Sequence, residues 1–160
     1  MAEILVLCIG NDARGDDGAG RAAARALQGA LPAGATLVEL SGEAVDILAQ
    51  LENVERVFIV DACFSGARPG ALHRFDVSAA PLPQEGFSLS SHGLGLHDAL
   101  ELARALGALP PLCVVHAIEG VHFEIGAGIS PAVAAGARQA AARVLEDLAA
   151  LLEQETKAHA

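Results

Sequence analysis

The stretch Arg56-Val57-Phe58-Ile59-Val60-Asp61-Ala62 is the clearest buried strand of the sequence. Its four consecutive apolar residues are typical of a parallel strand that is covered on both faces. The acid that follows them is costly to bury alone, so it must be paired, hydrogen-bonded or functional. Asp61 is therefore either a cap or turn residue of the next loop or a functional carboxylate at the end of a central strand.

Strand-like and helix-like segments alternate on both sides of this stretch. We predict strands over residues 3–9, 35–40, 56–62, 71–75 and 112–118, with 71–75 at a sheet edge. We predict helices over residues 17–29 (capped by Asp16), 44–51, 94–106 and 131 to about 153, with Ser130 as cap and Pro131 in the first turn of the last. This order predicts the α/β class, as a three-layer sandwich with a twisted, mostly parallel five-stranded sheet and helices on both faces.

Length and composition narrow the class of protein further. The 160 residues contain no repeat and no linker, so residues 1–160 are predicted to form a single domain with a frayed tail from about Thr156. Twenty acidic against ten basic residues give a net charge of −10. This charge argues against binding to nucleic acid, which requires neutralisation of phosphates, and against binding to an anionic membrane surface.

The sequence also predicts where the protein works. No apolar run approaches the 18 or so residues of a membrane span, and no basic segment precedes a long apolar one, so no export signal is visible. The three cysteines, Cys8, Cys63 and Cys113, show no C-x-x-C spacing and lie in apolar segments. We therefore expect a cytoplasmic protein with reduced thiols.

The loop after the first strand is rich in glycine and in acids. Ligands of α/β folds collect at the carboxyl ends of strands, so this loop is a candidate site. It has neither the G-x-G-x-x-G spacing nor a P-loop lysine, which argues against a flavodoxin-like nucleotide-binding domain. Asp12, Asp16 and Asp17 favour a cation over a phosphate. Asp16 and Asp17 are alternatively simple helix caps, although a helix start needs only one.

An imidazole completes a possible metal site. His92 lies between the irregular stretch and a helix start, next to Gly93, where a ligand has room, whereas His116 and His122 are weaker candidates. The other histidines, His73, His97 and His159, are expected to be solvated or ordinary polar residues. Two carboxylates and one imidazole from three segments form an open site that suits zinc, nickel, manganese or iron.

Five motifs in register resemble those of the hydrogenase maturation proteases. The resemblance rests on residues 4–11 with 15–20, 60–62, 91–96, 118–120 and 128–131. Members of that family are endopeptidases that remove a C-terminal extension from the nickel-iron hydrogenase large subunit after nickel insertion. The resemblance therefore implies this activity, a twisted sheet flanked by helices, and a large-subunit precursor as the partner.

The resemblance also assigns roles to residues of this chain. It implies that Asp17, Asp61 and His92 contact the metal and are catalytic, which leaves Asp16 to the cap. Nickel is expected to be presented by the substrate. Residues Ser41, Gly42 and Glu43 occupy the loop linked to substrate recognition, although the family's paired glycine is reduced here to Gly42.

Further expectations concern the mechanism and assembly. The sequence holds no Ser-His-Asp or Cys-His nucleophile, and nothing indicates an activated Cys63 thiol, so we expect direct attack by water. Residues 76–91 are expected to form a flap over the substrate, with an ordinary connecting loop as the alternative. We expect a monomer. A non-enzymatic nickel-binding chaperone or assembly factor that uses the same three residues is the alternative function.

Overall fold

The computed structural model describes residues 3–87 and 95–160. Its strands are β1 (Ile4–Ile9), β2 (Ala35–Leu40), β3 (Arg56–Cys63), β4 (Leu72–Asp76) and β5 (Leu112–Glu119). Its helices are the 3₁₀ helix η1 (Gly15–Gly18) and the α-helices α1 (Ala19–Leu27), α2 (Ala44–Leu51), α3 (Leu96–Ala105) and α4 (Pro131–Ala158). The predicted α/β class with five strands is confirmed.

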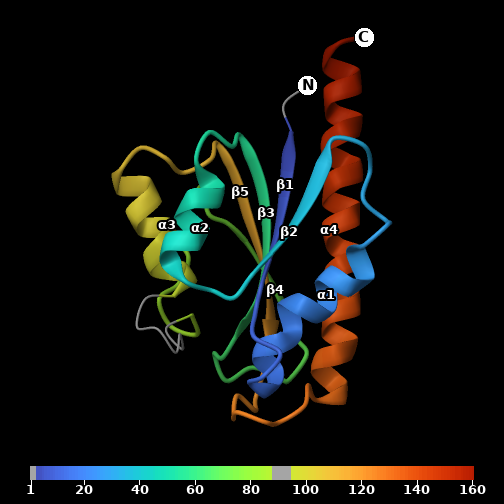
Figure 1. Cartoon of the computed structure of the whole chain (residues 1–160). Coiled ribbons are helices and arrows are strands. Elements are labelled where there is room, and N and C mark those ends of the chain that lie inside the picture. Colours follow the sequence, from blue (N-terminus) through green and yellow to red (C-terminus); the bar gives the residue numbers. More distant parts are fainter. Residues whose placement is uncertain (1–2, 88–94) are drawn as a thin grey trace.

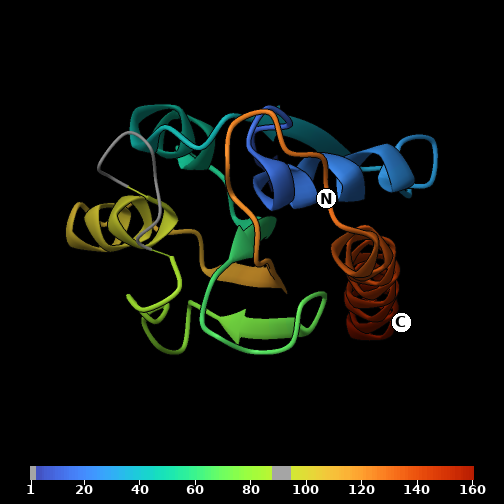
Figure 2. The same cartoon turned by 90° about the horizontal axis from the view of Figure 1, so that it is seen from below.

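The strands form one sheet in the order β2-β1-β3-β5-β4. All neighbouring strands are parallel except β4, which pairs antiparallel with β5 at the edge predicted for it. The central strand β3 lies between β1 and β5. The carboxyl ends of β1, β3 and β5 therefore meet at one end of the sheet, at the bottom of Figure 1 and facing the viewer in Figure 2.

Helices cover both faces of the sheet, which confirms the three-layer arrangement. Helices α2 and α3 pack side by side on one face, and α1 and α4 pack on the other (Figure 1). Strand β1 shows why both layers are needed, because every one of its residues is buried. Leu5, Leu7 and Ile9 join the core under α2 and α3, whereas Ile4, Val6 and Cys8 join the core under α1 and α4.

Small residues let α1 approach the end of β1 closely. Ala19, Ala23 and Ala24 are fully buried in the core shared with α4. A Cβ atom added to Gly20 would lie 2.0 Å from the carbonyl oxygen of Ile9, so this position accepts only glycine without a backbone shift. The close approach sets the position of η1, the turn that precedes α1 and carries the acids of the first loop.

Two predicted helix ends are wrong, and the predicted start of the last helix is right in position but lacks its capping hydrogen bond. Asp16 does not cap a helix over 17–29, because η1 comes first, α1 begins only at Ala19, and neither has a side-chain cap. Ser130 stands at the N-cap of α4 but makes no capping bond, while Pro131 does occupy the first turn. The helix continues to Ala158 instead of fraying from 156, supported by ion pairs from Arg56 to Glu155 and from Lys157 to Glu153.

Among the helices of residues 3–87 and 95–160, none is both long and apolar enough to cross a membrane. The longest, α4, is interrupted throughout by charged side chains.

Candidate functional site

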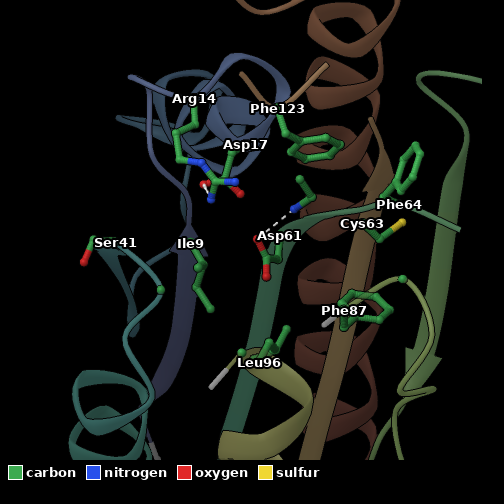
Figure 3. A pocket seen from close by; sticks show the side chains of 14 residues that line it. Ile9, Arg14, Asp17, Ser41, Asp61, Cys63, Phe64, Phe87, Leu96 and Phe123 are labelled. Atoms are coloured by element: carbon green, nitrogen blue, oxygen red, sulfur yellow. Dashed lines mark hydrogen bonds and ion pairs between the residues drawn. The ribbon is translucent and has the colours of Figure 1, made fainter. Parts of the chain in front are cut away.

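A cavity opens where the carboxyl ends of β1 and β3 meet the loops around them (Figure 3). Its polar wall comes from η1 and the end of β3, and its floor from Ile9 and Leu96. The residues that line it include Arg14, Asp17, Ser41, Gly42, Asp61, Cys63, Phe64, Phe87 and Phe123. The cavity thus lies at the end of the sheet where α/β folds bind ligands.

Asp61 reaches the cavity from β3, where it follows four buried apolar residues. The side chain is half-buried, and its Oδ1 accepts a hydrogen bond of 2.8 Å from the backbone N–H of Ala62. Burial raises the pKa of Asp61 well above its ordinary value, and the negative charge of Asp17 raises it further. Two carboxylates from different elements therefore act on each other across this cavity.

Asp17 reaches the same cavity from η1 (Figure 3). Burial raises its pKa, while the guanidinium of Arg14, 4.0 Å from the carboxylate, opposes the increase. Because both carboxyl groups resist ionisation when alone, a bound cation would stabilise the charged form of both. The pair can therefore bind a metal ion.

Asp16 has a different role from the predicted cap, and sequence reasoning missed it. Its fully buried carboxylate accepts hydrogen bonds from the backbone N–H groups of Val121, His122 and Ser130 and from the Ser130 hydroxyl, at 2.8–3.0 Å. These bonds hold the pKa of Asp16 below its ordinary value despite burial. Asp16 thus ties η1, and with it Asp17, to the loop that precedes α4.

The remaining predicted site residues fall into three groups. Ser41 and Gly42 line the cavity, whereas Glu43 is exposed and is not among the described residues that line it. His92 lies outside the described residues, as does the end of the predicted flap from 88 to 91. The described part of that flap is anchored, because Val77, Leu82 and Phe87 are buried in the core.

An aromatic wall beside the carboxylates was also missed. Phe64, Phe87 and Phe123 line the cavity, although the whole chain has only five phenylalanines and no tryptophan or tyrosine. The rings of Phe64 and Phe123 stack edge to face, 5.8 Å apart. The gathering of scarce aromatic residues could be seen only once the loops after β3 and β5 were placed side by side.

Cys63, His73 and His116 do not supply a nucleophile to this cavity. Burial and the nearby Glu119 raise the pKa of Cys63, so its thiol is protonated. His73, which was expected to be solvated, is half-buried and lies 3.0 Å from Glu119. His116 pairs with Asp147 at 2.7 Å, and neither residue is among those that line this cavity.

Comparisons with known proteins agree with this geometry. A sequence model described as hydrogenase maturation protease matches residues 23–147. Hydrogenase expression/formation protein HupD of Rhodobacter capsulatus is 30% identical over 157 residues, which are 96% of this chain and 75% of that protein.

Solved structures show the same similarity over nearly the whole chain. The hydrogenase maturating endopeptidase HybD from E. coli has a TM-score of 0.75 and 28% identity, covering 95% of this chain and 93% of that one. The [NiFe] hydrogenase maturation protease HybD from Thermococcus kodakarensis has a TM-score of 0.64 and 26% identity, covering 91% and 98%. With its fold, its paired carboxylates and these relatives, the chain belongs to the hydrogenase maturation protease family and is an endopeptidase.

Proposed function

We propose that this endopeptidase removes the C-terminal extension of a nickel-loaded [NiFe] hydrogenase large-subunit precursor. The observation that carries the proposal is the pair Asp17 and Asp61, which face one cavity from η1 and β3; burial raises the pKa of both, and the Asp17 charge raises the pKa of Asp61 further. The family membership supports the substrate class, and one solved relative is described as a [NiFe] hydrogenase maturation protease.

Nickel enters this reaction as part of the substrate. Asp17 and Asp61 offer carboxylate oxygens to the ion, and His92 is proposed as the third ligand because it completes the oxygen and nitrogen set that nickel accepts. Engagement of the seated ion brings the adjoining C-terminal segment to the cavity. Cleavage is therefore restricted to precursor that has already received its metal.

The hydrolytic step uses water as the nucleophile. Asp61 is the proposed proton acceptor, because its carboxylate lines the cavity into which the scissile bond is brought. Water attacks the scissile carbonyl and gives its proton to Asp61. The peptide C–N bond then breaks, and the proton passes to the leaving amine.

The loop after β2 and the aromatic wall recognise the substrate segment. Ser41 lies across the cavity from Phe64 and Phe123 (Figure 3), and Gly42 also lines it, so an extended peptide can lie between a polar rim and an apolar one. Gly42 has a φ of 107°, a conformation that favours glycine, and a Cβ atom added there would lie 3.3 Å from the Ile9 side chain. Exposed Glu43 then contacts a part of the precursor outside the cavity.

The wider setting follows from the same proposal. The enzyme acts as a monomer on the precursor in the cytoplasm, where its three free cysteines, all buried, stay reduced. Its net charge of −10 does not favour nucleic acid or an anionic membrane as a second partner.

Cleavage of purified nickel-loaded precursor, followed by mass spectrometry, tests the proposal. Asp17→Asn, Asp61→Asn and His92→Ala are each expected to abolish the shortened product. The control Asp12→Asn, whose side chain is 60% exposed in the same loop, is expected to cleave normally. Full activity in two of the three site variants would contradict the assignment. Binding of the precursor without any shortened product would favour the chaperone instead.

A further inference from the structure

A second group of metal-ligating side chains lies at the ends of three neighbouring strands. Cys63 ends β3, Glu119 ends β5, and His73 is the second residue of β4. Cys63 and Glu119 are direct partners in the parallel register, so both side chains lie on the same face of the sheet. Cys63 also lines the cavity that holds the paired aspartates, whereas, among the described residues, His73 and Glu119 do not.

Glu119 is the centre of this group. Its carboxylate is fully buried, and one oxygen, Oε2, accepts a 2.8 Å hydrogen bond from the backbone N–H of Ser65. The other oxygen, Oε1, lies 3.0 Å from Nε2 of His73 and 3.4 Å from Sγ of Cys63. The Ser65 hydroxyl also donates to Oε1. The Ser65 hydroxyl and the Cys63 thiol thus donate to a single buried oxygen that Nε2 of His73 also approaches, and the Ser65 N–H holds the partner oxygen in place.

We propose that Cys63, His73 and Glu119 bind a divalent ion of the zinc class, at a site that adjoins the aspartate cavity through Cys63 but does not use the paired aspartates as ligands. Their sulfur, nitrogen and oxygen atoms all lie within 4.8 Å of one another. Zinc–ligand bonds of about 2.0–2.3 Å imply tetrahedral edges of about 3.3–3.6 Å between ligand atoms. Two of the observed separations, 3.0 and 3.4 Å, are already close to such edges.

The ligand chemistry selects the ion. A thiolate with an imidazole and a carboxylate suits zinc, cobalt or nickel and disfavours magnesium and calcium, which prefer oxygen. The ion replaces the proton on the Cys63 thiol, which leaves to solvent, and binds Nε2 of a neutral His73 whose proton is on Nδ1. The Ser65 N–H bond to Oε2 then orients the carboxylate in the way that outer partners orient metal ligands.

The ion has an entry route and an open position. Cys63 and Glu119 are buried, but the His73 side chain is 31% exposed at the sheet edge formed by β4. Water can therefore fill the fourth position from that side. A bound ion would join the ends of β3, β4 and β5 and hold the 64–71 connection beside the cavity.

Titration of the metal-free chain with Co²⁺ tests the proposal, because cobalt occupies zinc sites and a bound thiolate gives a charge-transfer absorption band. We expect about one equivalent to produce the band, and Zn²⁺ to remove it by displacement. The Asp17→Asn/Asp61→Asn double variant is expected to show the same band. Cys63→Ala is expected to lose it, and His73→Asn to weaken binding by about tenfold or more. The matched control Cys113→Ala, also a buried strand cysteine, is expected to keep it.

Absorption spectroscopy at the zinc edge provides a measurement that needs no variant, and one sulfur ligand per ion is the expected result. Far-UV circular dichroism checks that each variant is folded. The proposal is overturned if the native chain gives no band, or if the band persists in folded Cys63→Ala. It is also overturned if the double aspartate variant loses the band, because the thiol would then belong to the carboxylate site. Since this site does not depend on the proposed cleavage, either proposal can fail alone.

Discussion

Replacement of Asp16 by asparagine is the sharpest test of how the site is held together. The carboxylate accepts two hydrogen bonds at each oxygen: Ser130 N–H and hydroxyl at Oδ1, and the N–H groups of Val121 and His122 at Oδ2. Asparagine keeps one oxygen, but its NH₂ group must face donors on the other side. At least two hydrogen bonds to a charged acceptor are lost, and buried N–H groups remain unpaired.

Each such hydrogen bond contributes about 1.5–3 kcal/mol, so Asp16→Asn is expected to lower the free energy of unfolding by about 3–6 kcal/mol. Urea unfolding followed by circular dichroism measures this change, since the chain has no tryptophan or tyrosine for fluorescence. The exposed neighbour Asp12 provides the control, and Asp12→Asn is expected to change stability by less than about 0.5 kcal/mol. The reasoning would be refuted if the Asp16→Asn chain unfolded at the same midpoint urea concentration as the native chain.

The difference in the free energy of unfolding between the native chain and Asp16→Asn is expected to depend on pH, and the direction of that dependence is fixed. The pKa of Asp16 is lower in the folded chain than its ordinary value of 3.8, so its ionised form stabilises the fold. That contribution is complete above the unfolded pKa and is lost as the pH falls through the folded one. The gap between native chain and Asp16→Asn is therefore expected to narrow below about pH 4. A gap that widens on acidification would contradict the assignment of the charge.

Three further changes give distinct results. Asp61→Asn is expected to raise the free energy of unfolding at pH 7 by about 1 kcal/mol or more, because burial and the Asp17 charge make ionisation of Asp61 costly. This gain disappears as the pH falls toward the unfolded pKa, where Asp61 is neutral in both states, and urea unfolding at several pH values measures it. Gly20→Ala is expected to cost about 3 kcal/mol in thermal unfolding, since the new Cβ would lie 2.0 Å from the Ile9 carbonyl oxygen. Phe64→Ala is expected to raise KM for the precursor about tenfold with little change in kcat, because an apolar wall of the cavity is lost.

Matched controls separate these effects from general damage. Gly128→Ala meets nothing within 4 Å and is expected to unfold within about 0.5 kcal/mol of the native chain. Leu106→Ala removes a side chain that is 69% exposed at the end of α3 and is expected to leave KM unchanged. A less stable Asp61→Asn chain at pH 7, a harmless Gly20→Ala or a native KM in Phe64→Ala would each contradict its prediction.

Local sequence pattern was enough to predict the fold. The predicted strand over 35–40 and helix over 44–51 have the same bounds as β2 and α2, because apolar periodicity and flanking glycine are local signals. The end of α4 was missed because its support is not local: Arg56, at the start of β3, pairs with Glu155 near the chain's end. The local composition near residue 156 does not indicate that long-range contact.

Site residues could be predicted from the sequence only where they lie at the end of a recognisable strand. Asp61 was identified because it follows four buried apolar residues, and its place in the cavity confirms the position, although its catalytic role stays a prediction. Asp16 was assigned to a helix cap because its real partners lie more than a hundred residues later. The contact between His73 and Glu119 was hidden for the same reason, since only antiparallel pairing of β4 with β5 brings them together.

The bonds of Asp16 also bear on when this enzyme can first work during its own synthesis. The ribosome releases η1 early, but the donors that bind Asp16 belong to Val121, His122 and Ser130 in a chain of 160 residues. Until those residues emerge, the turn that carries Asp17 lacks the hydrogen bonds that tie it to the loop before α4. A protease that processes other proteins therefore acquires its own working geometry only after the loop between β5 and α4 has been synthesised.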